Sequence, residues 1–220
     1  MNVEKKTIGA CIMVHNMAPF IGACIQSLQW TDGIFIFDDH STDGSIQVAL
    51  QHSRIPIIHE RSLADRMAFK KGERESRNYV IRRAFKKLGS GAMIIVDADE
   101  MVSALIRPHI VEMMRNHAID SIAFSTWHLY NEKKYLHFWE TKINGVSMID
   151  PHTRIIKAGR YFTPLFNDGS HPIIEPTLAT QCLHGPYHFH VKYHACSTLP
   201  NYSLFFLPKR PAMADVAPYL

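Results

Sequence analysis

Five short apolar runs, each bounded by polar or turn residues, recur along the first part of the chain. They cover residues 7–14, 33–38, 55–59, 92–97 and 121–127. Runs of about four to eight apolar residues have the length of strands rather than of helices. Because they show little alternation with polar residues, they predict strands buried within a sheet.

Amphipathic segments separate these runs. Residues 18–30 and 72–88 carry apolar side chains at helical spacing, and Pro19 suits the first turn of the earlier segment. Ser41 to Gly44 offers caps for a helix that follows, and residues 108–117 predict another. Strands and helices that alternate at this spacing indicate βαβ units. The prediction is an α/β fold with a mostly parallel central sheet flanked by helices on both faces.

The pattern changes at about residue 128. Short strand-like pieces, aromatic residues and histidines follow, with no long helix, and the tail after Pro200 holds several prolines. We therefore expect one domain with three parts: an α/β part over 1–127, a small β-rich extension over 128–200, and an extended tail over 201–220.

Composition narrows the function classes. The 220 residues are 46% hydrophobic and carry a net charge of +4, which is too balanced to indicate nucleic-acid binding. No run resembles a signal peptide or reaches the roughly 18 apolar residues that a membrane span needs. The four cysteines are too sparse for a disulfide framework. These features predict a soluble cytoplasmic protein.

Polar residues follow three of the predicted strands. They are His15-Asn16, Asp38-Asp39, and Asp97-Ala98-Asp99-Glu100. Ligands of parallel α/β sheets bind beyond the carboxyl ends of the strands. Clustered carboxylates repel one another, and a divalent cation that bridges them to a diphosphate would relieve this cost. The pattern therefore indicates a metal-assisted phosphate site.

Four segments in order, IGACIMVHN, GIFIFDDHSTDGS, GERESRNYVI and MIIVDADE, resemble the family 2 glycosyltransferases with the Rossmann-like GT-A fold. The resemblance covers residues 7–127. It implies a donor site for a nucleotide-diphosphate sugar and a requirement for Mn²⁺ or Mg²⁺. Met17 departs from the pattern, since the family usually has an acidic residue there.

The resemblance also implies roles for single residues. Asp97 and Asp99 match the metal-binding DxD element, and we expect that loss of either abolishes metal-dependent donor binding while the fold stays intact. Arg77 would assist departure of the diphosphate. The residues implied in donor binding are His15, Asn16, Asp38, Asp39, Arg74, Arg77, Asn78 and Asp97.

The second half offers weaker candidates. The segment PHTRIIKAGRYF resembles the part of some family members that follows the acceptor loop. Asp150, Asp168 and Glu175 are candidates for the general base of an inverting enzyme, and the polar context of Asp168 favours it. A C-terminal histidine completes the metal shell in many such enzymes. His188 or His190 would fit, and His190 is taken with Asp97 and Asp99 as the metal set; a separate Zn²⁺ site is an alternative.

The leading hypothesis is a metal-dependent glycosyltransferase. The acceptor would be a hydroxyl of a glycan, a lipid-linked glycan or a small metabolite, and the resemblance allows peripheral association with membranes. Alternatives are a nucleotide-sugar-binding protein without catalysis and a sugar-1-phosphate nucleotidyltransferase. The latter needs a glycine-rich phosphate loop after the first strand, which HNMAPFIGA lacks.

Overall fold

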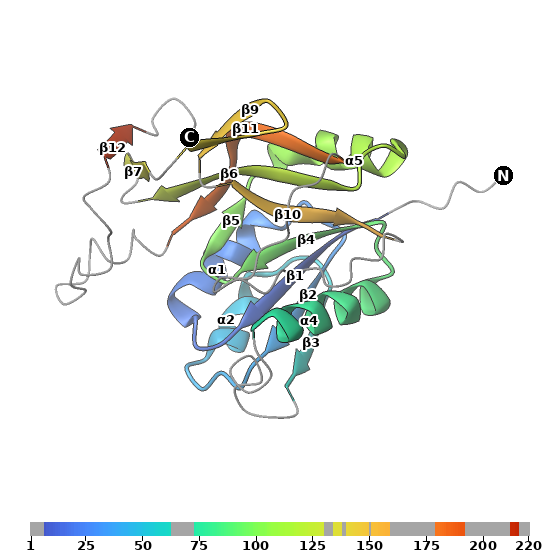
Figure 1. Ribbon diagram of the computed structural model, residues 1–220. Coiled ribbons are helices and arrows are strands. Elements are labelled where there is room, and N and C mark those ends of the chain that lie inside the picture. Colours follow the sequence, from blue (N-terminus) through green and yellow to red (C-terminus); the bar gives the residue numbers. More distant parts are fainter. Residues whose placement is uncertain are drawn as a thin grey trace.

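The computed structural model describes residues 7–62, 73–129, 134–137, 140–149, 151–158, 179–191 and 212–215. Four parallel strands form the first half of its sheet, in the order β4-β1-β2-β3 (Figure 1). They are β1 (Ile8–Val14), β2 (Gly33–Asp38), β3 (Ile57–Arg61) and β4 (Ala92–Asp97).

The sheet continues beyond β4 with strands from the second half of the chain. β10 (Pro151–Lys157) pairs antiparallel with both β4 and β6 (Ser121–Leu129), so the two halves share one sheet. β11 (Thr180–His190) runs parallel to β6 and antiparallel to the short β5 (Glu100–Val102). The remaining strands are β7 (Lys134–His137), β12 (Ala212–Asp215) and the hairpin β8 (Glu140–Ile143) with β9 (Val146–Ile149).

Helices cover both faces of the sheet, and each face has its own core (Figure 1). Alternate residues of β1 point in opposite directions: Ile12 packs with α1 (Ala18–Ser27) and α5 (Arg107–Arg115), whereas Cys11 packs with α4 (Glu73–Leu88). α2 (Ser45–His52) and the short η1 (Ala104–Ile106) lie on the α1 side. This two-sided burial explains why the strands are apolar throughout.

The predicted α/β architecture is confirmed. β5 was not expected, because three residues after an acidic turn carry no strand pattern of their own. The helix predicted over 18–30 ends at Ser27. No helix in the described ranges is both long enough and apolar enough to cross a bilayer.

Candidate functional site

The parallel strands β1, β2 and β4 end at one edge of the sheet, and polar side chains follow each of them. Val14 lies beside Asp38 on β2, and Met13 lies beside Asp97 on β4. Because β1 separates the other two strands, Asp38 and Asp97 are about 10 Å apart, twice the strand spacing. The predicted acidic residues therefore share an edge but form two groups.

The loops after β1 and β2 are tied together by the first group. Asn16 adopts a left-handed backbone conformation (φ 54°), and its Oδ1 accepts a hydrogen bond from Thr42 N at 2.8 Å. His15 Nδ1 lies 2.6 Å from the carbonyl oxygen of Asp39. Since a carbonyl only accepts, Nδ1 carries the proton here. The two residues expected to meet the nucleotide base thus also shape the loop that would hold it.

Asp38 and Asp39 are both buried at the end of β2. Asp38 Oδ1 accepts a hydrogen bond from Ser41 N at 2.7 Å, and its Oδ2 lies 3.7 Å from His59 Nε2 and 4.0 Å from Arg61 Nε. Asp39 N donates to Val14 O, which fixes the start of the loop. Asp38 therefore holds the turn, while both residues remain predicted contacts of the base or ribose.

The unusual Met17 coincides with a helix cap supplied by the neighbouring loop. Met17 is the N-cap of α1 and makes no side-chain cap of its own. Instead Met17 N donates to Ser45 Oγ at 2.7 Å, and Ala18 N donates to Asp43 Oδ2 at 2.9 Å. These bonds satisfy two backbone N–H groups at the start of α1 that have no acceptor within the helix.

We expect Asp43→Ala to destabilise the protein by about 1–2 kcal/mol, as loss of a helix cap does. Besides Ala18, Asp43 also binds the backbone N–H and hydroxyl of Ser45. Urea unfolding measures the effect, and Asp43→Asn, which retains one accepting oxygen, should fall between the two proteins. An alanine variant as stable as the unmodified protein would contradict this role.

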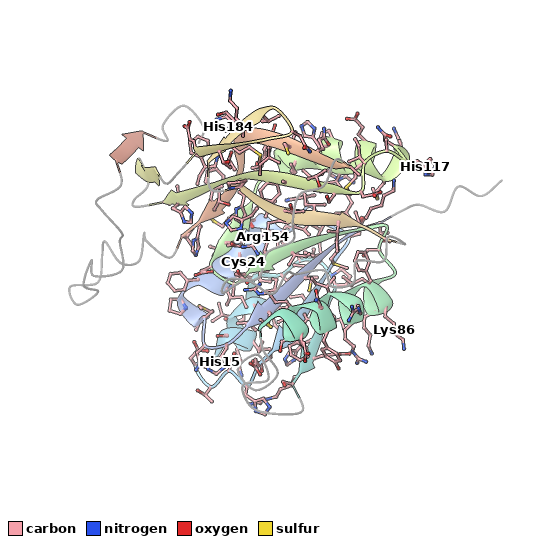
Figure 2. All side chains as sticks on the ribbon, viewed as in Figure 1. His15, Cys24, Lys86, His117, Arg154 and His184 are labelled. Carbon is pink, nitrogen blue, oxygen red and sulfur yellow. The ribbon has the colours of Figure 1, made fainter. Side chains whose placement is uncertain are left out.

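The second polar group is centred on Asp97, which two arginines hold. Arg77 Nη1 of α4 lies 2.7 Å from Asp97 Oδ1, and Arg154 Nη2 of β10 lies 3.4 Å from Asp97 Oδ2. Arg154 Nη2 also donates to Glu100 Oε1 at 2.5 Å, and Glu100 Oε2 accepts from Asp97 N. Figure 2 shows Arg154 at the centre of the molecule. The arginines thus relieve much of the charge repulsion that the acidic sequence suggested.

The arginines, rather than solvent, keep the carboxylates of this group ionised. Burial opposes ionisation of Asp97, but Arg77 and Arg154 outweigh it and hold the pKa of that carboxyl below its usual value. Burial likewise opposes ionisation of Glu100, yet Arg154 and His188 keep its pKa well below the usual range. Both carboxylates are therefore charged at neutral pH.

Asp99 faces β11 instead. Asp99 Oδ2 lies 3.1 Å from His190 Nε2, and the His190 side chain is 20% exposed. Burial disfavours the charged form of His190, but the hydrogen bond and charge of Asp99 outweigh it and raise its pKa. Two residues along, His188 is fully buried beside Glu100, and burial lowers its pKa to about 4 despite that carboxylate. His188 is neutral and internal, whereas His190 reaches the surface.

A bulge in β11 decides which histidines face the acids. Residues 184–187 of β11 lie opposite a single residue of β6, Ser125, whose Oγ lies 3.0 Å from His184 Nδ1. Beyond the bulge, His188 pairs with Thr126 and His190 with His128. Leu183 pairs with Phe124 and His188 with Thr126, and these two residues of β6 share a face. Because His184 follows Leu183 directly, it points away from the face that carries His188 and His190.

The other predicted site residues are placed less fully. Asn78 is buried on α4, one residue after Arg77. Arg74 belongs to α4, but its side chain lies outside what the structure describes. Asp168 lies outside the described residues altogether. Among the described residues, no group of three or more His, Cys, Asp or Glu side chains could hold a metal ion. Asp99 with His190 is the pair that the structure brings together.

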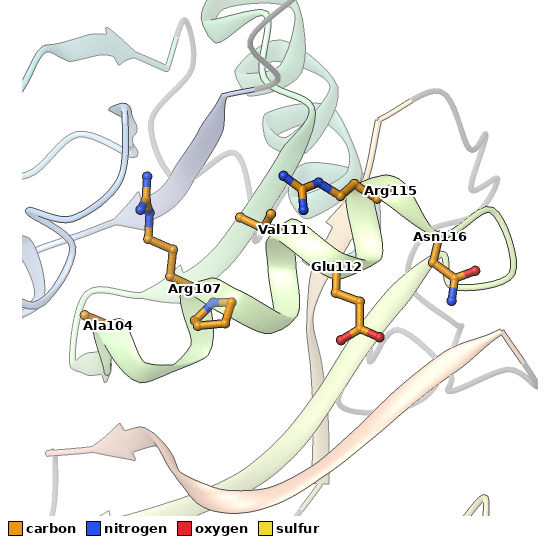
Figure 3. A pocket seen from close by; sticks show the side chains of 7 residues that line it. Ala104, Arg107, Val111, Glu112, Arg115 and Asn116 are labelled. Atoms are coloured by element: carbon orange, nitrogen blue, oxygen red, sulfur yellow. The ribbon is translucent and has the colours of Figure 1, made fainter. Parts of the chain in front are cut away.

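A hollow of about 790 Å³ lies elsewhere, along α5 (Figure 3). Arg107, Val111 and Arg115 contribute to its lining, and none of the predicted site residues does. Because its lining shares no residue with the carboxyl edge of the sheet, we do not assign the chemistry to it.

Sequence reasoning missed two residues of the site. Arg154 appeared only inside a resembling segment, although a buried arginine in an apolar strand needs a carboxylate partner and so signals an ion pair. His128 marked only the point where the pattern changed. Its contact with His190, described below, joins residues that are distant in the sequence, and no local pattern reports it.

The fold and this edge define an α/β protein with a polar ligand site beyond its parallel strands. The model of glycosyl transferase family 2 matches residues 10–171, more than half of the chain. The protein therefore belongs to the family 2 glycosyltransferases. No curated protein gives a significant match to the sequence.

Solved structures with the same fold include TarS of S. aureus. The fragment 1–349 has a TM-score of 0.54 and 11% identity, over 84% of this chain and 60% of that one. A complex of this fragment with UDP gives a TM-score of 0.46 and 14% identity, over 58% and 40%. Glucosyl-3-phosphoglycerate synthase from Mycobacterium tuberculosis, in complex with Mn²⁺ and UDP, gives 0.40 and 15%, over 57% and 45%. The chain thus spans about 40–60% of these solved chains.

Proposed function

We propose that this protein transfers a sugar from a nucleoside-diphosphate sugar to a hydroxyl acceptor, with a divalent cation at the diphosphate. Membership of family 2 supports the reaction class. The observation that carries the proposal is the pairing of Asp99 with His190 beside the Arg77–Asp97 ion pair, at the carboxyl edge of the sheet.

The residues present fit a divalent cation bound together with its substrate. Mg²⁺ and Mn²⁺ at phosphate sites commonly take one or two protein ligands and fill the other positions with water and phosphate oxygens. Asp99 and His190 offer one carboxylate and one imidazole, whose nearest atoms are 3.1 Å apart. When bound, the cation would neutralise charge that develops on the leaving diphosphate.

The chain's own residues would bind and orient the donor. The loops held by Asn16, His15 and Asp38 would receive the nucleoside. Arg77, oriented by Asp97, would hold the diphosphate through its planar guanidinium. Asp168 remains the proposed general base for the acceptor hydroxyl.

A thermal-shift panel of UDP, GDP, dTDP and CMP, each with and without Mn²⁺, tests the proposal. A nucleotide at a hundred times its dissociation constant stabilises a protein by about 2.7 kcal/mol, or about 5–10 °C for a chain of this size. We expect such a shift from one nucleoside diphosphate and only with Mn²⁺. No shift from any member of the panel would overturn the donor site.

Turnover separates an enzyme from a binding protein. Release of the nucleoside diphosphate from its sugar conjugates, measured with Mn²⁺ present, should be detectable even when water replaces the unidentified acceptor. A nucleotide shift without any release over many hours, with or without added glycans, would favour the non-catalytic alternative.

A further inference from the structure

His188 and His190 of β11 each contact a carboxylate on one side and a side chain of β6 on the other. His188 is described first, as the comparison for His190. His188 Nε2 lies 3.3 Å from Glu100 Oε2, and its Nδ1 lies 3.0 Å from Thr126 Oγ1 on β6. His188 is 0% exposed, and Arg154 engages the same Glu100. The ring is therefore sealed between the carboxylate and the hydroxyl and has a structural role.

The outer histidine repeats this arrangement with one difference. His190 Nε2 lies 3.1 Å from Asp99 Oδ2, and its Nδ1 lies 3.0 Å from Nδ1 of His128 on β6. The rings of His128 and His190 meet edge to face at a centroid distance of 5.0 Å. His128 is buried, while His190 keeps part of its ring at the surface. The partner on β6 is thus an imidazole in place of a hydroxyl.

The identity of that partner matters because a histidine ring has only two nitrogens. In the structure as described, Nε2 of His190 donates to the Asp99 carboxylate, which can only accept. To offer a lone pair on Nε2 to a cation, a neutral His190 must give up that proton and carry its proton on Nδ1. That Nδ1–H needs an acceptor, since a buried donor without one is costly. His128 Nδ1, at 3.0 Å, is placed to accept it.

We propose that His128 is a positioning residue, which fixes the ring orientation of His190 and accepts its Nδ1–H when the cation takes the place of the Nε2 proton, and thereby presents His190 Nε2 to the cation at the diphosphate. The inference rests on the proposed function, because it assumes that Asp99 and His190 bind that cation. Loss of a residue that hydrogen-bonds a metal ligand in this way lowers metal affinity by about 10–100-fold.

The test measures the dissociation constant of Mn²⁺ by electron paramagnetic resonance, with saturating UDP, for four variants and the unmodified protein. In His128→Asn the amide stands near the place of Nδ1 and offers an acceptor, whereas His128→Gln carries its amide near the place of Nε2. His128→Leu removes both. We expect the Asn variant to bind Mn²⁺ almost as tightly as the unmodified protein, and the Gln and Leu variants about 10-fold more weakly or worse.

Thr126→Val is the matched control, since it removes the corresponding partner of His188. It should lower the free energy of unfolding but leave the Mn²⁺ dissociation constant unchanged. If His128→Leu does not fold, the comparison of Asn with Gln decides. Equal Mn²⁺ affinity in the Gln variant and the unmodified protein would overturn the role of His128 alone. Absence of Mn²⁺ binding by the unmodified protein would overturn the Asp99–His190 site itself, and the role of His128 with it.

Discussion

Asp99→Asn is expected to abolish Mn²⁺-dependent binding of the nucleoside diphosphate and to lower turnover by at least about 100-fold. A cation at a leaving diphosphate supplies several kcal/mol of charge stabilisation, and each 1.4 kcal/mol corresponds to about a factor of ten in rate. The asparagine removes the negative charge that attracts the cation but keeps the shape of the side chain. Titration with Mn²⁺ in the presence of UDP, together with donor turnover, measures both effects.

Glu112→Gln is the control for this change. Glu112 is an exposed carboxylate on α5, so the substitution alters net charge equally without touching the carboxyl edge of the sheet. It should leave Mn²⁺-dependent binding unaltered. If Asp99→Asn retained the Mn²⁺ dependence of the unmodified protein, the metal assignment to Asp99 would be wrong.

Asp97 is a poorer position for the same test. The sequence suggested that Asp97→Ala would leave the fold intact, but Asp97 contacts both Arg77 and Arg154 in the interior of the site. Its removal would leave two guanidinium groups with less compensation, so we expect a loss of stability as well as of donor binding. Unfolding must therefore be measured alongside binding for any Asp97 variant.

Arg154→Met is expected to destabilise the protein by about 3–5 kcal/mol. Breaking a buried ion pair from one side has this cost, because the remaining charge is left without compensation. Here the stranded carboxylates would be Glu100 and Asp97. Methionine retains much of the side-chain volume, so lost packing contributes little. Urea unfolding at neutral pH measures the change.

The pH dependence of the loss provides a second signature. In the unmodified protein the pKa of Glu100 is lowered on folding, so its contribution to stability is present above the unfolded pKa of about 4.3 and is lost as the pH falls. Without Arg154, the largest of the interactions that oppose burial is lost and that pKa rises, so the variant is penalised most at neutral pH. The difference in stability between the two proteins should therefore shrink between pH 7 and pH 4.

The ion pair of Arg83 with Glu60 is a more exposed pair with which the buried Arg154–Glu100 pair can be compared. These side chains are 2.7 Å apart but more exposed to solvent, and exposed pairs contribute little. Arg83→Met should thus cost much less than Arg154→Met, with little change between the two pH values. Similar losses in both variants would show that Arg154 is not a specific support of the carboxyl edge.

Local pattern was sufficient for most of the architecture. The apolar runs at 33–38 and 92–97 became β2 and β4 with their predicted limits, because strands buried on both faces must be apolar throughout. The helix predicted over 72–88 became α4 because its apolar positions follow helical spacing. Polar residues at successive strand ends also placed the site at one edge, since parallel strands end together.

Burial within an element was harder to predict. Leu50 on α2 is 52% exposed, while Ala49 beside it is fully buried. The helical period sets which residues share a face, but the docking of α2 against α1 selects the face that is covered. That choice depends on side chains of another helix, about 25 residues earlier in the chain.

The amino-acid sequence alone determined the alternating α/β order, the family, and the edge of the sheet at which polar side chains gather. Only the tertiary structure decided which of those side chains meet. Arg154 reaches Asp97 and Glu100 from β10, Asp43 caps a helix that begins 25 residues before it, and the bulge in β11 turns His190 toward Asp99 and His128. The physical reason is that periodicity and propensity act over one or two turns of chain, whereas buried charges and hydrogen-bonding groups find partners across whatever strands the fold brings together.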